Sequence, residues 1–200
     1  ICSWLTARGV EFRTDTCVAD VTMAGDTDNR RVTELQLATG EVIAVAPDDR
    51  VYLTLGSMTD ATVTGLRDVP PPGENGPSPS FDLWQQLATR YEGLGRPDVF
   101  FGHSQHTSWT SFTATLDSPA FVTFMEDFSG NRTGTGGLVT FAESGWLMSI
   151  VMFHQPHFRN QPADRPVFWG YGLRGDRPGD AVRKPMAQAT GAEILEELGH

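Results

Sequence analysis

Residues 146–153 read Trp-Leu-Met-Ser-Ile-Val-Met-Phe, and Gln155-Pro156 follows this apolar run closely. An apolar run of this length next to a turn signal is typical of a buried strand. Residues 138–141 form a shorter apolar run just upstream, so the two runs together predict a hairpin. Working outward from this hairpin, residues 167–173 and 109–116 predict two more strands of the same region.

Helical segments surround these strands. Apolar residues recur at helical spacing over residues 81–91, 117–128 and 184–198. Pro119 stands at a tolerated early position of the second segment, and Thr190-Gly191 predicts a break in the third. Strands and helices together place the chain in a mixed α/β (α+β) fold class.

The first third of the chain predicts a small β-meander. Polar turns separate short alternating runs at 16–23, 31–37 and 41–46. Residues 1–9 are typical of the end of a helix, and residues 10–12 of a short strand. Residues 50–55 predict a buried strand that ends at Gly56.

A connection rich in proline and glycine, residues 68–80, divides the sequence. Such a composition predicts irregular structure rather than a helix or strand. We therefore expect one domain over residues 1–67 and a second over residues 81–200.

Composition narrows the classes of function. The chain has 200 residues, a formal net charge of −10 and 39% hydrophobic residues, which is typical of a folded acidic protein and argues against nucleic acid as the main partner. No apolar run reaches the roughly 18 residues that a membrane-spanning helix needs. Two cysteines, Cys2 and Cys17, exclude a disulfide scaffold, so we expect free thiols and a cytoplasmic protein.

Two glycine-containing stretches raise the question of a binding site. Gly56-Ser57-Met58-Thr59 follows a predicted strand, where ligands bind in open α/β sheets, although a plain turn fits the same pattern. Residues 130–137 hold four glycines but lack the Lys-Ser/Thr ending of a phosphate-binding loop. For this second stretch we expect only the approach to a hairpin.

Histidine pairs raise the question of a metal site. His103-x-x-His106 and His154-x-x-His157 have no carboxylate or cysteine at ligand spacing, so we expect no metal. The turn at residues 155–159 places His157 beside Arg159. An imidazole and a guanidinium together suit a carboxylate, and a solvated turn is the alternative interpretation.

Ten stretches in order resemble the oleate hydratases, the FAD-containing fatty-acid hydratase family first known as the myosin-cross-reactive antigen. They lie between residues 55 and 195 of the chain: Leu55-Gly56-Ser57-Met58-Thr59, Ser108-Trp109-Thr110, Gly134-Thr135-Gly136-Gly137-Leu138-Val139-Thr140-Phe141, Trp146-Leu147-Met148-Ser149, Gln155-Pro156-His157-Phe158, Asn160-Gln161-Pro162, Trp169-Gly170-Tyr171-Gly172-Leu173, Gly179-Asp180, Lys184-Pro185-Met186 and Thr190-Gly191 with Glu193-Ile194-Leu195.

The resemblance implies an internal and C-terminal-half piece of a two-dinucleotide-fold flavoprotein. Residues 1–67 would form part of a Rossmann-like FAD-binding domain with its β-meander, and residues 81–200 a mixed-sheet substrate domain. The backbone of Val18 would lie against the adenine of FAD, and Gly56, Ser57 and Met58 against the flavin. The resemblance places the family's catalytic Glu and Tyr upstream, so no residue here is expected to be catalytic, and the piece alone is expected to be inactive.

The resemblance also implies how the substrate's carboxylate is held. In the family, a Thr and an Asn two residues apart, on the strand before Gln-Pro-His, hold the carboxylate together with the His. His157 matches, but Val151 and Phe153 stand at the other two positions. Residues two apart on a strand share a face, so this face is apolar here. We expect either a carboxylate held by His157 and Arg159 or a substrate with a different length or head group.

The function implied is the addition of water across the cis-9 double bond of an oleate-like unsaturated fatty acid, which gives a 10-hydroxy fatty acid, with FAD in a structural and electrostatic role. Three alternatives stay open: another FAD-dependent enzyme such as a fatty-acid isomerase or an amine-oxidase-like oxidoreductase, a lipid-binding piece without activity, and a truncated product that does not fold stably. Peripheral membrane contact and a homodimer are open as well.

Overall fold

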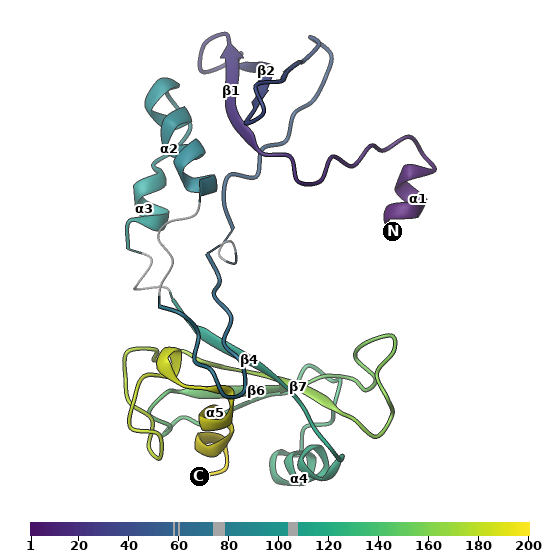
Figure 1. Cartoon of the computed structure of the whole chain (residues 1–200), viewed down its shortest axis with the longest axis vertical. Coiled ribbons are helices and arrows are strands. Elements are labelled where there is room, and N and C mark those ends of the chain that lie inside the picture. The colour runs from purple at the N-terminus through teal and green to yellow at the C-terminus, as the bar shows by residue number, and fades with distance from the viewer. Residues whose placement is uncertain (58, 60, 74–78, 104–107) are drawn as a thin grey trace. The chain divides into compact units, whose positions relative to one another are not determined.

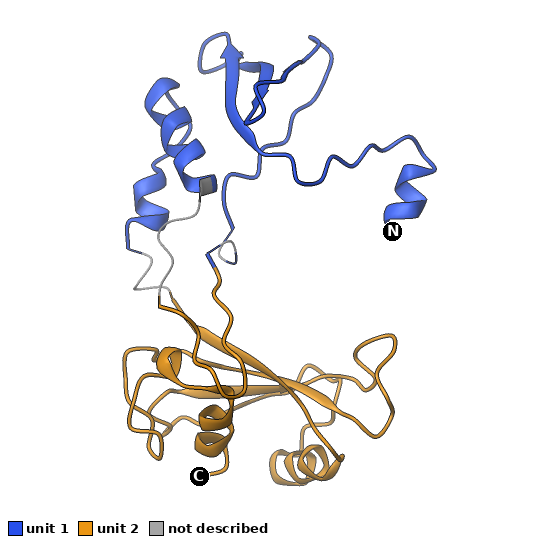
Figure 2. Ribbon diagram, viewed as in Figure 1, with its two compact units in different colours: residues 1–61, 76–103 blue, residues 62–75, 104–200 orange. Residues whose placement is uncertain are grey.

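The computed structural model of the protein describes residues 1–57, 59, 61–73, 79–103 and 108–200. The chain falls into two compact units. Unit 1 comprises residues 1–61 and 76–103, and unit 2 comprises residues 62–75 and 104–200 (Figure 2). Each unit is built from two separate segments, so the units differ from the consecutive ranges expected from the sequence. The predicted mixture of helices and strands is confirmed.

Unit 1 contains the predicted meander as an antiparallel sheet in the order β1-β2-β3, with β1 at Val18–Ala24, β2 at Arg31–Leu37 and β3 at Val42–Ala44 (Figure 1). Asp26 fixes the turn between the first two strands. Its carboxylate accepts hydrogen bonds from the backbone N–H groups of Asp28 (3.2 Å) and Asn29 (3.1 Å). Asp favours this kind of turn because its short side chain reaches the backbone two residues on.

Unit 1 also contains three helices: α1 at Cys2–Thr6, α2 at Pro79–Arg90 and α3 at Pro97–Phe101. Helix α2 confirms the prediction at 81–91, and its Leu87 is fully buried. Helix α3 was not predicted, because five residues are too few to show helical spacing. Its one local signal is Pro97, since proline is favoured in the first turn of a helix.

Two predicted strands of unit 1 are wrong. Residues 10–12 and 50–55 run without a strand partner among the described residues, and Tyr52 is 90% exposed. A strand is defined by the neighbouring backbone that pairs with it, and apolar composition does not supply that neighbour.

Unit 2 is built on a four-stranded sheet in the order β4-β7-β6-β5 (Figure 1). Its strands are β4 at Thr110–Thr115, β5 at Leu138–Thr140, β6 at Met148–Met152 and β7 at Val167–Gly172. All three neighbouring pairs are antiparallel, which corrects the expectation of a mixed sheet. Short connections such as the one between β5 and β6 favour this arrangement, because a parallel pair needs a long crossover.

The core of unit 2 lies on one face of this sheet. The alternate residues Met148, Ile150 and Met152 of β6 are buried there. Helix α4 (Ala120–Ser129) and helix α5 (Gly191–Leu198) lie on the same side of the sheet (Figure 1). They cover this face with the buried side chains Val122, Met125 and Ile194.

The predicted two-part helix at residues 184–198 is confirmed as the 3-10 turn η2 at Met186–Gln188 followed by α5. Thr190 separates them and caps α5. Its hydroxyl accepts a hydrogen bond from Glu193 N (3.2 Å), and the Glu193 carboxylate accepts one from Thr190 N (2.8 Å), which is a capping box. The ammonium of Lys184, 2.7 Å from that carboxylate, lowers the pKa of Glu193, and the N–H of Thr190 adds to this.

The helices of both units are short, and α2 is the longest of those described, with 12 residues. None of the helices in the described ranges is long and apolar enough to cross a membrane.

Glu197 joins α5 to the loop that precedes it. Only 7% of this residue is exposed, and its carboxylate accepts hydrogen bonds from three consecutive backbone N–H groups, those of Asp180 (2.5 Å), Ala181 (2.9 Å) and Val182 (2.7 Å). Gly179 is required beside it, because an added Cβ there would lie 2.6 Å from the carboxylate. The buried carboxylate is therefore satisfied by backbone donors rather than by a cation.

Glu197→Ala should lower the free energy of unfolding by about 2–4 kcal/mol, because it leaves three backbone N–H groups without an acceptor. Glu196→Ala, at the exposed neighbouring position of the same helix, is the matched control and should change it by less than about 0.5 kcal/mol. Chemical denaturation of the purified protein measures both. Equal effects of the two substitutions would contradict the role given to the Glu197 carboxylate.

Candidate functional site

A hollow of about 280 Å³ lies within unit 1, between the start of β1, residues 54–55 and the first turns of α2. It is lined by Cys17, Val18, Thr54, Leu55, Ser80 and Leu83. The lining combines apolar side chains with two hydroxyl groups. Val18, singled out from the sequence, is half-buried in this wall. Ligand sites are commonly mostly apolar concavities with a few polar groups, so this hollow is a candidate site.

Gly56 follows the hollow's lining and has a left-handed backbone, with φ at +118°. A Cβ placed on it would lie 2.5 Å from Cε1 of Phe81, a residue of α2. The Phe81 ring in turn stacks on Phe101 of α3, with the ring centroids 4.8 Å apart. The Phe81 ring therefore occupies the space where any residue other than glycine would carry its Cβ.

Ser57 and Met58 complete the set predicted from the sequence to lie against a flavin. The Ser57 hydroxyl is exposed and lies 2.9 Å from the Thr59 hydroxyl, and it also accepts a hydrogen bond from Thr59 N (3.2 Å). Ser57 thus forms a local turn while keeping an exposed polar edge. Met58 lies outside the described residues.

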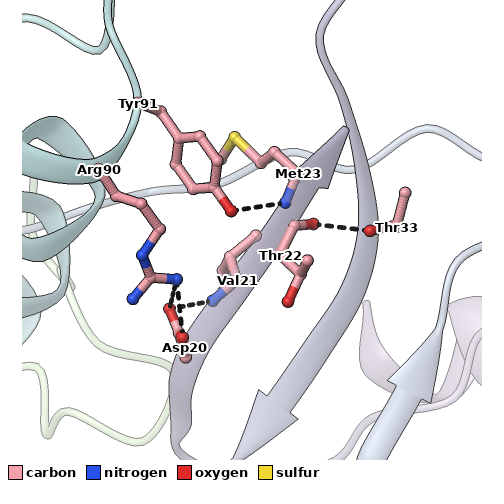
Figure 3. Close-up of polar contacts among 7 residues, drawn as sticks. All are labelled: Asp20, Val21, Thr22, Met23, Thr33, Arg90 and Tyr91. Carbon is pink, nitrogen blue, oxygen red and sulfur yellow. Dashed lines mark hydrogen bonds and ion pairs between the residues drawn. The ribbon is translucent and has the colours of Figure 1, made fainter. Parts of the chain in front are cut away.

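The far end of α2 is tied to β1 by two polar contacts, which Figure 3 draws. One guanidinium nitrogen of Arg90 lies 3.0 and 2.9 Å from the two carboxylate oxygens of Asp20. The Tyr91 hydroxyl accepts a hydrogen bond from Met23 N (3.0 Å). The hydrogen bond to Asp20 is the main cause of a raised pKa of Arg90, so this guanidinium stays charged.

Unit 2 offers a second candidate surface, on the sheet face opposite the helices. Trp169 and Tyr171 of β7 stand on this face with their ring centroids 4.9 Å apart, and Trp109 packs against both at 5.8 and 5.4 Å. Val151 pairs with Trp169 across the strands and shares the face. We call these four residues the aromatic face. Trp109 is 42% exposed, so the cluster reaches the surface.

Phe153 and His157 lie just past the end of β6 and are brought together. The imidazole of His157 stacks flat on the Phe153 ring, with centroids 3.9 Å apart and planes 12° from parallel. Phe158 meets the same imidazole edge-on at 4.9 Å. Of the three residues predicted to meet the substrate, the structure therefore brings Phe153 and His157 together, while Val151 lies on β6 beside Trp169. Arg159 is exposed nearby in sequence.

Two glutamines fix the turn that carries His157, and sequence reasoning assigned them no role. The side-chain amide of Gln155 donates to Phe153 O (3.0 Å) and Val167 O (2.7 Å), while its oxygen accepts from Val167 N (3.1 Å). The oxygen of Gln161 accepts from His157 N (2.8 Å). Their residue type is the one signal in the sequence. A side-chain amide both donates and accepts hydrogen bonds, so it can satisfy backbone groups that lack a strand partner at an irregular turn.

The glycine-rich stretch at residues 130–137 is the loop between α4 and β5, as expected. Glu126 holds it by accepting hydrogen bonds from Thr133 N (2.7 Å) and the Thr133 hydroxyl (2.9 Å). These bonds, the backbone one first, lower the pKa of Glu126. Gly134 N donates to Met152 O (3.1 Å), so this amide is already bonded within the protein.

The described residues contain no group of three or more His, Cys, Asp or Glu side chains that could hold a metal ion. His154 and His157 are both exposed and lie on opposite sides of the cis Gln155–Pro156 peptide bond. His106, from the first histidine pair, lies outside the described residues.

Comparison with known proteins gives one family and two named relatives. The model of the MCRA family matches residues 1–200. The chain is 31% identical over 206 residues to an oleate hydratase of Streptococcus pyogenes serotype M49 (strain NZ131), which covers 98% of this chain and 35% of that protein. It is 32% identical over 175 residues to a linoleate hydratase of Lactiplantibacillus plantarum. The aligned part is 84% of this chain and 31% of that protein. The chain thus spans about a third of the length of these relatives.

Gly56→Ala should destabilise the protein by about 2–4 kcal/mol, because the methyl group adds a clash with Phe81 to the backbone strain. Gly40→Ala is the matched control: its φ is +88° and its Cβ would meet nothing within 4 Å, so strain alone should cost about 1 kcal/mol. Thermal and chemical denaturation compare the two variants. If the two costs are the same, Phe81 does not use the space at Gly56.

Proposed function

Because this chain belongs to the MCRA family, we propose that the protein is a fatty-acid hydratase that adds water across the cis-9 double bond of an oleate-like unsaturated fatty acid. The product is a 10-hydroxy fatty acid. One water is consumed, its hydroxyl group goes to carbon 10 and a proton goes to carbon 9, so the reaction involves no net oxidation or reduction.

The observation that carries this proposal is similarity across nearly the whole chain to two proteins that are named hydratases of unsaturated fatty acids. The two named substrates, oleate and linoleate, are long-chain unsaturated fatty acids. A substrate of this class needs a long apolar surface for its chain and a polar group for its head.

The aromatic face supports the chain-binding part of the proposal. It is apolar, partly exposed and lies on the sheet face away from helices α4 and α5. An acyl chain laid along it would bury apolar area, at about 25 cal/mol for each Å² removed from water. Phe153, two residues after Val151, stacks on His157, which would bind the polar head.

In this proposal the hollow in unit 1 would receive part of an FAD molecule. Val18 and Leu55 offer apolar contact to a flat ring, and the hydroxyl groups of Thr54 and Ser80 offer polar partners at its edge. In this proposal FAD would supply an electrostatic element for the reaction, without redox change. By the family resemblance, the backbone of Val18 would lie against the adenine, and Gly56 and Ser57, with Met58 from outside the described residues, against the flavin.

Within this proposal the 200 residues position substrate and cofactor rather than transfer the proton. A general acid must protonate the alkene and a general base must orient the water. By the family resemblance, we assign these tasks to a Tyr and a Glu outside these residues. His157 and the aromatic face would set which double bond reaches them, since a held head group fixes the distance along the chain.

Protein expressed from its complete gene, incubated with oleate and excess FAD, should give a product heavier than oleate by one water. Gas chromatography–mass spectrometry identifies the product and the carbon that bears the hydroxyl group. A control without FAD tests the cofactor, and a hydrogen peroxide assay tests for oxidase chemistry. Intact FAD binding with no hydroxy acid from oleate or linoleate would overturn the proposal, and peroxide formation would favour the oxidoreductase alternative.

His157→Ala should raise the KM for oleate about tenfold or more while kcat changes little, because a head-group contact far from the double bond contributes binding in both ground and transition state. His154→Ala is the matched control, since His154 is an exposed histidine three residues away. Steady-state kinetics with oleate measures both variants. The head-group role of His157 is wrong if the two substitutions have the same effect on KM.

A further inference from the structure

The hollow in unit 1 has one wall that belongs to a helix. Ser80 and Leu83 come from the first turns of α2, whereas Cys17 and Val18 come from the start of the meander. The width of the hollow therefore depends on how α2 lies against β1. At the other end of the helix, Arg90 and Tyr91 make polar contacts to β1 that hold the two elements together.

Those contacts form a small network around the end of α2 (Figure 3). Asp20 accepts from both Arg90 and Val21 N (2.8 Å), so its carboxylate joins the helix end to the strand backbone. Tyr91 accepts the N–H of Met23, an amide of the same strand two residues further on. Arg90 and Tyr91, neighbours at the end of α2, thus bind β1 at Asp20 and at Met23.

Arginine side chains hold the ring of Tyr91 in place. The guanidinium carbons of Arg30 and Arg90 lie 5.6 and 5.7 Å from the ring centroid, within the range of cation–π attraction. Arg30, on the segment that leads into β2, also donates to the backbone oxygen of Glu92. The helix end is therefore bound to both β1 and the approach to β2, which restricts rotation as well as translation of α2.

We propose that Asp20, Arg90 and Tyr91 are positioning residues for FAD binding, because they hold α2 at the spacing from β1 that the hollow requires. None of the three lines the hollow, so they act through Ser80 and Leu83. This inference rests on the proposed function only in taking FAD as the occupant. The spacing of the two walls is a property of the protein alone.

The chain supplies its own reporter of that spacing. Cys17 is a free, exposed thiol in the lining of the hollow, and Cys2 is a free, exposed thiol in α1 that serves as an internal reference. It also supplies a matched control pair. Arg13 and Glu41 form an exposed ion pair of similar length, 2.8 Å, beside the same sheet. This pair does not involve α2. Glu41→Gln removes that pair as Asp20→Asn removes the one to Arg90.

The experiment measures three quantities on full-length Asp20→Asn, Tyr91→Phe and Glu41→Gln proteins: the FAD dissociation constant, the alkylation rate of Cys17 relative to Cys2 without FAD, and the melting temperature. Asp20→Asn should weaken FAD binding about threefold to fivefold, the range of a partly exposed ion pair. The double variant Asp20→Asn/Tyr91→Phe should weaken it about tenfold or more, and both should change the alkylation rate of Cys17 relative to Cys2. Asp20→Glu, which keeps the carboxylate, should restore most of the affinity.

The outcomes separate this inference from the function it rests on. If the wild type binds no FAD, the cofactor proposal fails, and the relative Cys17 alkylation rate still tests the spacing of the walls. If FAD affinity and Cys17 alkylation are the same in Asp20→Asn as in Glu41→Gln, the contacts have a structural role only and the inference is overturned. A lower melting temperature with unchanged FAD affinity overturns it as well.

Discussion

The two-residue period of β6 is the constraint on which unit 2 depends. Because successive side chains of a strand point to opposite faces, Met148, Ile150 and Met152 can enter the core only if Val151 points away from it. A shift of the strand register by one residue would exchange these two sets. The present core residues would become exposed, and the space between the sheet and helices α4 and α5 would lose the side chains that fill it. The strand that stabilises the unit therefore also determines which residues the opposite face presents.

Sequence patterns predicted the elements whose signals are local. The meander, helices α2, α4 and α5 and all four strands of unit 2 have spacing that shows in a short window. The break at Thr190-Gly191 was predicted too, and the structure adds that Thr190 caps α5. The 50–55 strand was wrong because its partner, not its composition, decides whether a strand forms. The pairing of β7 with β4 and β6 depends on contacts that no single window contains, and the five-residue helix α3 is too short to show helical spacing.

The candidate sites show the same difference between local sequence signals and contacts made by residues far apart in the sequence. The resemblance to a family singled out Val18, Gly56 and His157 by position, and the structure adds how each is supported. Phe81 packs on Gly56, and Gln161 holds the backbone at His157. Such supporting residues escape sequence reasoning because a short window does not show which side chain will reach back to which backbone group. The roles of the predicted residues toward FAD and substrate stay predictions.

The separation of faces on β6 has a consequence for how such a protein changes over generations. A substitution at Val151 or Phe153 alters what the open surface presents but leaves the packing of Met148, Ile150 and Met152 behind it untouched. Selection can therefore act on what the open face presents with little risk to foldability. The backbone of the strand can serve as a fixed frame on which the surface chemistry of that face diversifies.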